Sequence, residues 1–158
     1  MQENITAMLV ENRPGTLGAL RLGLEKQSIT ISTARSCGEA ALALWSEHPP
    51  HLVFTEVDLA DGNWANIVAL AARAGAPVNV IVVARFVDVG FYVHAIERGA
   101  FDFIVPPLSE SDFLHVARTA AANVVRQRIE HAPPLPTADR AAEPKRHQPG
   151  HAAAGAQN

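Results

Sequence analysis

The sequence predicts an α/β domain in which helices cover both faces of a doubly wound, five-stranded parallel sheet. Short runs of β-branched and apolar residues alternate with longer stretches of helical periodicity, which is typical of repeated strand–helix–strand units. Most of the short runs are almost continuously apolar, as expected of strands that are buried on both faces. A chain of 158 residues with 48% hydrophobic residues is also large enough to form one such core.

Five strands and five helices follow from this pattern. The expected strands are the β-branched and apolar runs between turn signals, at residues 5–10, 29–34, 52–55, 78–84 and 101–105. The expected helices are the stretches between and after them, at about residues 16–27, 36–48, 63–74, 88–98 and from 109 onward.

Local signals support the ends of these helices. Ser36 and Glu39 have the spacing of a capping box at the start of the second helix, and Pro49 follows its end. Gly99 closes the fourth helix, and Ser109 is a suitable N-cap for the last one. The strand–helix alternation is therefore delimited along the whole of the first 130 residues.

The composition divides the chain into a domain at residues 1–130 and a Pro/Ala-rich tail at residues 131–158. The tail holds five of the eleven prolines, and Leu135 is its one large aliphatic residue. Such a segment cannot build a core, so we expect it to be disordered. Its "PPLP" motif is an alternative ligand for a polyproline-binding partner.

Charge and cysteine content exclude several classes of function. The formal net charge of -3 gives no basic surface for nucleic acid. Cys37 is the single cysteine, so an internal disulfide is impossible and a reducing cytoplasm fits best. We find no signal-peptide pattern and no apolar run of membrane-spanning length, so we expect no membrane association.

Candidate functional residues lie just beyond the carboxyl ends of the expected strands. Doubly wound sheets gather functional groups at this edge, near the point where the strand order reverses. These positions are occupied by Glu11, Asn12, Glu56, Ala84 and Pro106. We expect these five residues to lie close together.

Residues 5 to 128 resemble the receiver domain of two-component response regulators. "AMLVENRP" resembles the first strand of that family with its acidic pair, and "EVDLADG" resembles the segment whose first aspartate accepts phosphate. "ERGAFDFIVPPL" resembles the stretch that carries the switch aromatic and a Lys-Pro pair. The resemblance implies a flavodoxin-like topology, with Glu56 at the phosphoacceptor position, Phe103 at the switch aromatic and Pro107 at the proline.

The polar positions of the family's phosphorylation chemistry are nearly all altered in this chain. Glu11 keeps a carboxylate, but Asn12 stands where the family has an acid that binds magnesium directly, and an amide is a poorer ligand. Ala84 replaces the hydroxyl that holds a phosphoryl oxygen, and Pro106 replaces the lysine that pairs with it. We therefore expect no cofactor, with at most weak magnesium binding at Glu11 and Glu56.

Two interpretations of Glu56 remain open. Its longer side chain would reach toward the position of a phosphoryl oxygen, as a permanent mimic of the phosphorylated state. Because Ala84 and Pro106 lack the groups that such a mimic would engage, we favour a structural acid that is hydrogen-bonded to Asn12 or to loop amides. With Glu11 nearby, we expect either a proton on one carboxyl group or a cation that bridges the two.

We interpret the chain as a degenerate receiver, or pseudo-receiver, which is not an enzyme and signals by protein contact without aspartyl phosphorylation. One alternative is a receiver that is still phosphorylated slowly at Glu56 or Asp58, although we interpret Asp58 and Asp61 as solvated loop acids. Another is a flavodoxin-like enzyme or flavin binder. No Gly-rich phosphate loop follows the first strand, which disfavours flavin.

The resemblance also predicts where a protein partner or a second copy binds, because the family uses its fourth helix, fifth strand and last helix for such contacts. In the fourth helix, the residues with the spacing of a core-facing stripe are Val89, Tyr92, Val93 and Ile96. The residues expected on the solvent side, and therefore in the partner contact, are Phe91, His94, Ala95 and Arg98.

Overall fold

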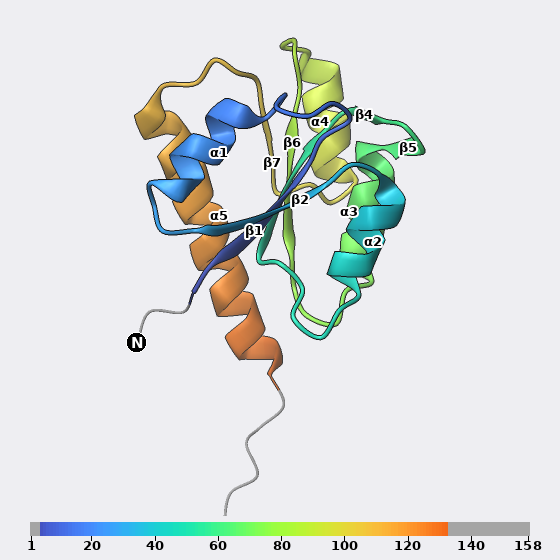
Figure 1. The fold of residues 1–158 in the computed structure, drawn as a ribbon, viewed down its shortest axis with the longest axis vertical. Coiled ribbons are helices and arrows are strands. Elements are labelled where there is room, and N and C mark those ends of the chain that lie inside the picture. The colour runs from blue at the N-terminus through green and yellow to red at the C-terminus, as the bar shows by residue number, and fades with distance from the viewer. Residues whose placement is uncertain (1–3, 133–158) are drawn as a thin grey trace, which may run out of the picture.

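The computed structural model describes residues 4–132 and confirms the predicted fold class (Figure 1). Five parallel strands form the sheet in the order β2-β1-β3-β6-β7. Their bounds are β1 (Thr6–Val10), β2 (Thr30–Ala34), β3 (Leu52–Glu56), β6 (Asn79–Val83) and β7 (Asp102–Ile104). The chain moves outward from β1 to β2 and then returns to β3, so the strand order reverses between β1 and β3.

Five helices cover the two faces of the sheet, as predicted. Their bounds are α1 (Gly18–Glu25), α2 (Cys37–Leu44), α3 (Trp64–Ala72), α4 (Val89–Glu97) and α5 (Glu110–His131). Helices α1 and α5 lie on one face, while α2, α3 and α4 lie on the other (Figure 1). The sheet is therefore doubly wound.

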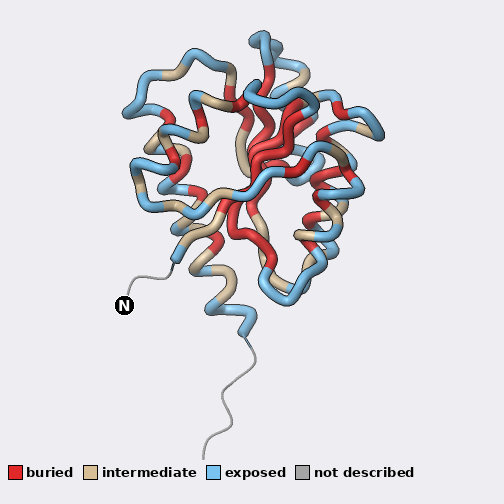
Figure 2. Tube along the Cα trace, in the orientation of Figure 1, coloured by how far each residue is buried: buried red, intermediate tan, exposed pale blue. Residues whose placement is uncertain are grey.

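Each face of the sheet has its own hydrophobic core, because side chains alternate along every strand. Met8 and Val10 point toward α2, α3 and α4, whereas Ala7 and Leu9 point toward α1 and α5. The central strands are buried throughout (Figure 2). This double burial explains why their sequences are nearly continuously apolar.

An additional hairpin follows β3 and was not predicted. Its two strands, β4 (Asp58–Leu59) and β5 (Gly62–Asn63), are antiparallel and lie outside the main sheet. Asn63 then caps α3 by accepting hydrogen bonds from the backbone N–H groups of Ala65 and Asn66. A Cβ atom at Gly62 would lie 2.6 Å from Asn66 Oδ1, so a larger residue would have to displace the Asn66 side chain, which accepts a hydrogen bond from the backbone N–H of Asn63.

The last helix that the structure describes, α5, is tied to the edge of the domain opposite the candidate site. Asn79 Nδ2 donates to the carbonyl of Ala120 at 2.9 Å. Arg128 donates to the carbonyls of Pro77, Pro49 and Pro50 at 2.9, 3.1 and 2.9 Å, and so joins α5 to two loops.

The predicted tail lies almost entirely outside the described residues. The helix α5 ends at His131, one residue beyond the predicted boundary, and residues 133–158 are not described. Between residues 4 and 132, no helix is both long enough and apolar enough to cross a bilayer.

Candidate functional site

The carboxyl ends of β1, β3 and β6 bring the predicted site residues to one edge of the sheet. Glu11 and Asn12 follow β1, Glu56 is the last residue of β3, and Ala84 follows β6. The two acids are buried, with 4% of Glu11 and 8% of Glu56 exposed. Pro106 lies in the loop after β7 and is exposed.

Glu11 supports the start of α1. Its Oε2 accepts a hydrogen bond of 2.9 Å from the backbone N–H of Leu17, the N-cap residue of a helix that has no capping side chain of its own. A carboxylate at this position also interacts favourably with the positive end of the helix dipole. Glu11 is thus engaged in holding the loop between β1 and α1.

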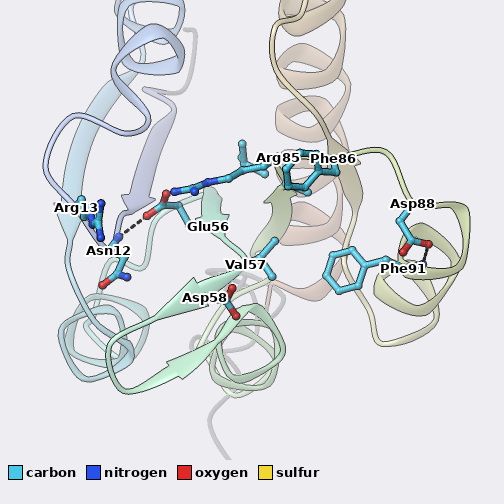
Figure 3. Close-up of a pocket in the computed structure, with 11 residues that line it drawn as sticks. Asn12, Arg13, Glu56, Val57, Asp58, Arg85, Phe86, Asp88 and Phe91 are labelled. Atoms are coloured by element: carbon cyan, nitrogen blue, oxygen red, sulfur yellow. Dashed lines mark hydrogen bonds between the residues drawn. The ribbon is translucent and has the colours of Figure 1, made fainter.

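Glu56 is hydrogen-bonded to the same loop. Its Oε2 accepts a hydrogen bond from the backbone N–H of Asn12, as Figure 3 shows. The interpretation of Glu56 as an acid bonded to Asn12 is therefore confirmed, with the backbone rather than the side-chain amide as the donor. Two buried acids each bind one end of the segment between Glu11 and Leu17.

Glu56 lies between two cavities. The first has a volume of about 550 Å³ and is lined by Asn12, Asp58 and Phe91 among others. The second has a volume of about 680 Å³ and extends along α1 and α5, where Pro106 forms part of its wall. Cavities of this size are in the range of small-ligand sites. Ala84 lines both cavities and offers only a methyl group to them.

Arg85 is the site residue that sequence reasoning missed. It follows Ala84 directly and lines both cavities together with Glu56. In Figure 3 its side chain extends across the site toward Glu56. A basic residue immediately beyond the end of β6 was the available signal.

Asp61 is exposed, as expected of a loop acid, but it also connects the hairpin to α2. Its two carboxylate oxygens accept hydrogen bonds from the backbone N–H groups of Cys37 at 2.7 Å and Gly38 at 3.0 Å. These bonds, first that of Cys37 and then that of Gly38, lower the pKa of Asp61 below its usual value. Asp58 is exposed on the rim of the first cavity.

The predicted helical phase of α4 is wrong. Ala95 is fully buried and Phe91 is partly buried, whereas the four residues expected in the core are exposed. These four are Val89, Tyr92, Val93 and Ile96. Neither Phe91 nor Ala95 therefore forms an outward surface, while His94 and Arg98 are exposed as expected.

Aromatic packing explains this phase. The ring of Phe91 makes edge-to-face contacts with Trp64 of α3 and Phe103 of β7, at centroid distances of 5.4 and 5.1 Å. Trp64 also meets the ring of His94 at 5.7 Å. Ala95 is small enough to let the helix lie close to the sheet. Phe103, at the predicted switch position, is buried among these rings.

A metal site is not apparent from the donor groups. In residues 4–132, no three or more His, Cys, Asp or Glu side chains are grouped so that they could hold a metal ion. The two carboxylates of Glu11 and Glu56 are each engaged with backbone N–H groups. Weak magnesium binding at these two acids stays a prediction.

Known proteins share both the sequence pattern and the fold. The response regulator receiver domain family matches residues 7–118. The transcriptional regulatory protein KdpE of Mycobacterium tuberculosis H37Rv is 30% identical over 129 residues, which cover 78% of this chain and 56% of that protein. The photosynthetic apparatus regulatory protein RegA of Cereibacter sphaeroides is 24% identical over 108 residues, covering 68% and 58%. The chain thus spans little more than half the length of these relatives.

Solved structures agree with this assignment at the level of the fold. A receiver domain from Methanospirillum hungatei superposes with a TM-score of 0.66 and 18% identity, over 78% of this chain and 98% of that one. The non-phosphorylated HemR receiver domain of Leptospira biflexa gives 0.63 and 21%, over 75% and 95%. The family match covers well over half of the sequence and favours a receiver over a flavin binder. The chain belongs to the response regulator receiver domain family of two-component signalling.

Proposed function

We propose that this chain is a pseudo-receiver, which signals through protein contacts without a cycle of aspartyl phosphorylation. The proposal rests on the burial and hydrogen bonding of Glu56. Its carboxylate stands where the family's phosphoacceptor does, but it is buried and already accepts a hydrogen bond from Asn12. A nucleophile that is engaged in this way is poorly placed to attack a phosphodonor.

The surrounding positions support the same proposal. A phosphoryl group on a receiver acts through a hydroxyl and an ammonium group, and here Ala84 and Pro106 provide neither. Asn12 offers a neutral amide in place of a magnesium-binding carboxylate. The residues that would attach a phosphoryl group and the residues that would respond to it are thus both altered.

A surface on α4 is the proposed route of output. We define the outer α4 surface as the exposed apolar residues of the helix and of the loop before it: Phe86, Val87, Val89, Tyr92, Val93 and Ile96. Six exposed apolar side chains in one segment are typical of an interaction site. We propose that a protein partner or a second copy binds there, with His94 and Arg98 at the rim.

Treatment with a phosphodonor tests the loss of phosphorylation. Incubation with acetyl phosphate and magnesium should add no phosphoryl mass, and beryllofluoride should leave the amide NMR spectrum unchanged. Titration calorimetry should show no tight one-site magnesium binding. The matched control restores the family's groups as Asn12→Asp, Glu56→Asp, Ala84→Thr and Pro106→Lys, and this variant should gain phosphoryl mass.

A stoichiometric gain of one phosphoryl group by the unaltered chain would contradict the proposal. Fragment mass spectrometry would then assign it to Glu56 or to Asp58. Asp58 is the relevant second candidate because it is exposed and lines the first cavity beside Glu56.

A further inference from the structure

The hydrogen bond of Glu56 does not by itself explain how the charge of its buried carboxylate is compensated. The side chain is 8% exposed, and its hydrogen-bond partner is the neutral N–H of Asn12. Burying a carboxylate is costly unless a cation or several hydrogen bonds compensate it. In the resembled family a lysine at the position of Pro106 supplies that cation, and a proline cannot.

Arg85 is placed to compensate the charge from the other side. It lies on the first residue of the loop after Ala84, and its side chain is directed across the site toward the carboxylate (Figure 3). Arg85 and Glu56 line both cavities. Arg13 lines the first cavity but not the second and lies on the far side of Asn12, so it serves as a comparison.

We propose that Arg85 is the resident cationic partner of Glu56 and takes the place of the lysine that Pro106 replaces. This inference rests on the proposed function, since a Glu56 that received phosphate would have to release this partner. A guanidinium group suits the role because its planar fork can pair with both carboxylate oxygens while its other side faces solvent.

The pairing would link the buried site to the outer α4 surface. The loop that begins with Arg85 also carries Phe86 and Val87, whose exposed fractions are 80% and 81%. It ends at Asp88, which caps α4 by accepting a hydrogen bond of 3.0 Å from the N–H of Phe91. A bond between Arg85 and Glu56 thus fixes one end of this loop, and the Asp88 cap fixes the other.

A double-mutant cycle on the full chain tests the pairing directly. Urea denaturation is measured for the unaltered chain, Glu56→Gln, Arg85→Met and the double variant. If the two residues pair, the effect of the double substitution on the unfolding equilibrium constant should differ from the product of the two single effects by a factor of about five. Effects that multiply to within a factor of about two would overturn the proposal, and a larger deviation supports it if the Arg13 control cycle does not deviate equally.

A matched cycle gives the control. Arg13→Met with Glu56→Gln should multiply to within a factor of about two, because Arg13 lies beyond Asn12. Equal deviations in the two cycles would mean that Glu56 responds to net charge rather than to Arg85, which overturns the proposal. If Glu56→Gln does not fold, Glu56→Asp takes its place, since it keeps the charge and draws the carboxylate back from Arg85.

Hydrogen exchange provides a second readout that does not depend on global stability. Arg85→Met and Glu56→Gln should both speed amide exchange in residues 85–88, and Arg13→Met should not. Unchanged exchange in both variants would overturn the link to the loop. The acetyl phosphate experiment separates this inference from the proposed function, because a chain can fail the cycle and still gain no phosphoryl mass.

Discussion

At the scale of single residues, Asp61 shows how one side chain can join two distant parts of the sequence. Its carboxylate holds the β4–β5 turn against the first turn of α2 through Cys37 and Gly38. The helix already has Ser36 as its N-cap, which accepts a hydrogen bond from Glu39 at 3.0 Å. Asp61 therefore satisfies backbone N–H groups that the cap leaves unpaired.

Replacing Asp61 with Asn should lower the stability of the domain in a pH-dependent way. The pKa of Asp61 is lower in the folded protein than in the unfolded chain, so its ionised form contributes stability that is fully present above the unfolded pKa. That contribution is lost as the pH falls through the folded pKa, below about pH 4. The urea midpoints of the two proteins should differ at pH 7 and approach each other near pH 3.

Asp58→Asn is the control for this experiment. Asp58 is an exposed acid on the same hairpin, and the two proteins should have equal midpoints at all pH values. A difference between Asp61→Asn and the unaltered chain that stayed constant from pH 7 to pH 3 would exclude an electrostatic origin.

The sequence predicted part of the site at this scale. The edge of the sheet and the hydrogen bond between Glu56 and Asn12 followed from strand order and from the resemblance. The direction of Arg85 did not, because a long exposed side chain is oriented by the path of its loop. The hydrogen bonds of exposed Asp61 did not follow either, since its partners are backbone groups that no sequence pattern marks.

At the scale of the element, α4 shows the limit of hydrophobic periodicity. The helix carries large apolar residues on both sides, so hydrophobic periodicity predicts that the stripe with the greater apolar content faces the core. The structure instead buries Ala95 and places Phe91 between the rings of Trp64 and Phe103. Tertiary packing decides the phase where the pattern is ambiguous.

Two aspartate substitutions should distinguish the inner and outer sides of α4. Phe91→Asp should unfold the domain or lower its melting temperature strongly, because a charge would enter an aromatic cluster. Phe91→Ala should cost about 2 kcal/mol, less than a fully buried phenylalanine because the ring is only partly buried. Thermal melts followed by circular dichroism measure both effects.

Val93→Asp is the matched variant on the exposed side. It should change stability by less than about 0.5 kcal/mol and should reduce self-association or partner capture if the outer α4 surface is the contact. Sedimentation equilibrium and pull-down record this second effect. Loss of the fold in Val93→Asp with a stable Phe91→Asp would reverse the phase described above.

At the scale of the whole molecule, the predicted topology holds because alternating strands and helices leave few ways to cover both faces of a parallel sheet. The length of α5 was less predictable, since its last turns depend on Arg128. This residue reaches the carbonyls of Pro49, Pro50 and Pro77, which lie in loops that precede β3 and β6. Contacts between such distant segments leave no local pattern.

Truncations on either side of Arg128 should therefore behave differently. A chain that ends after Ala132 should keep its melting temperature to within about 2 °C, because the residues removed carry little apolar area. A chain that ends after Gln127 should melt lower by about 5 °C or more, since three carbonyls lose their donor. Differential scanning calorimetry measures both, and a large loss in the longer truncation would show that the tail docks on the domain.

The two tryptophans differ in exposure, so fluorescence can report the position of α4. Trp64 is buried beneath α4 in contact with Phe91 and His94, while Trp45 is 52% exposed on the far end of α2. In a Trp45→Phe variant, the remaining tryptophan fluorescence comes from Trp64. The polarity of the surroundings of its indole ring depends on how closely α4 packs against the sheet. A ligand that binds to the outer side of α4 without moving it leaves the emission maximum of Trp64 unchanged. A ligand that displaces α4 from the sheet exposes Trp64 and shifts the emission maximum to longer wavelength. Tryptophan fluorescence can thus distinguish ligand binding on α4 from movement of α4, which a binding measurement does not separate.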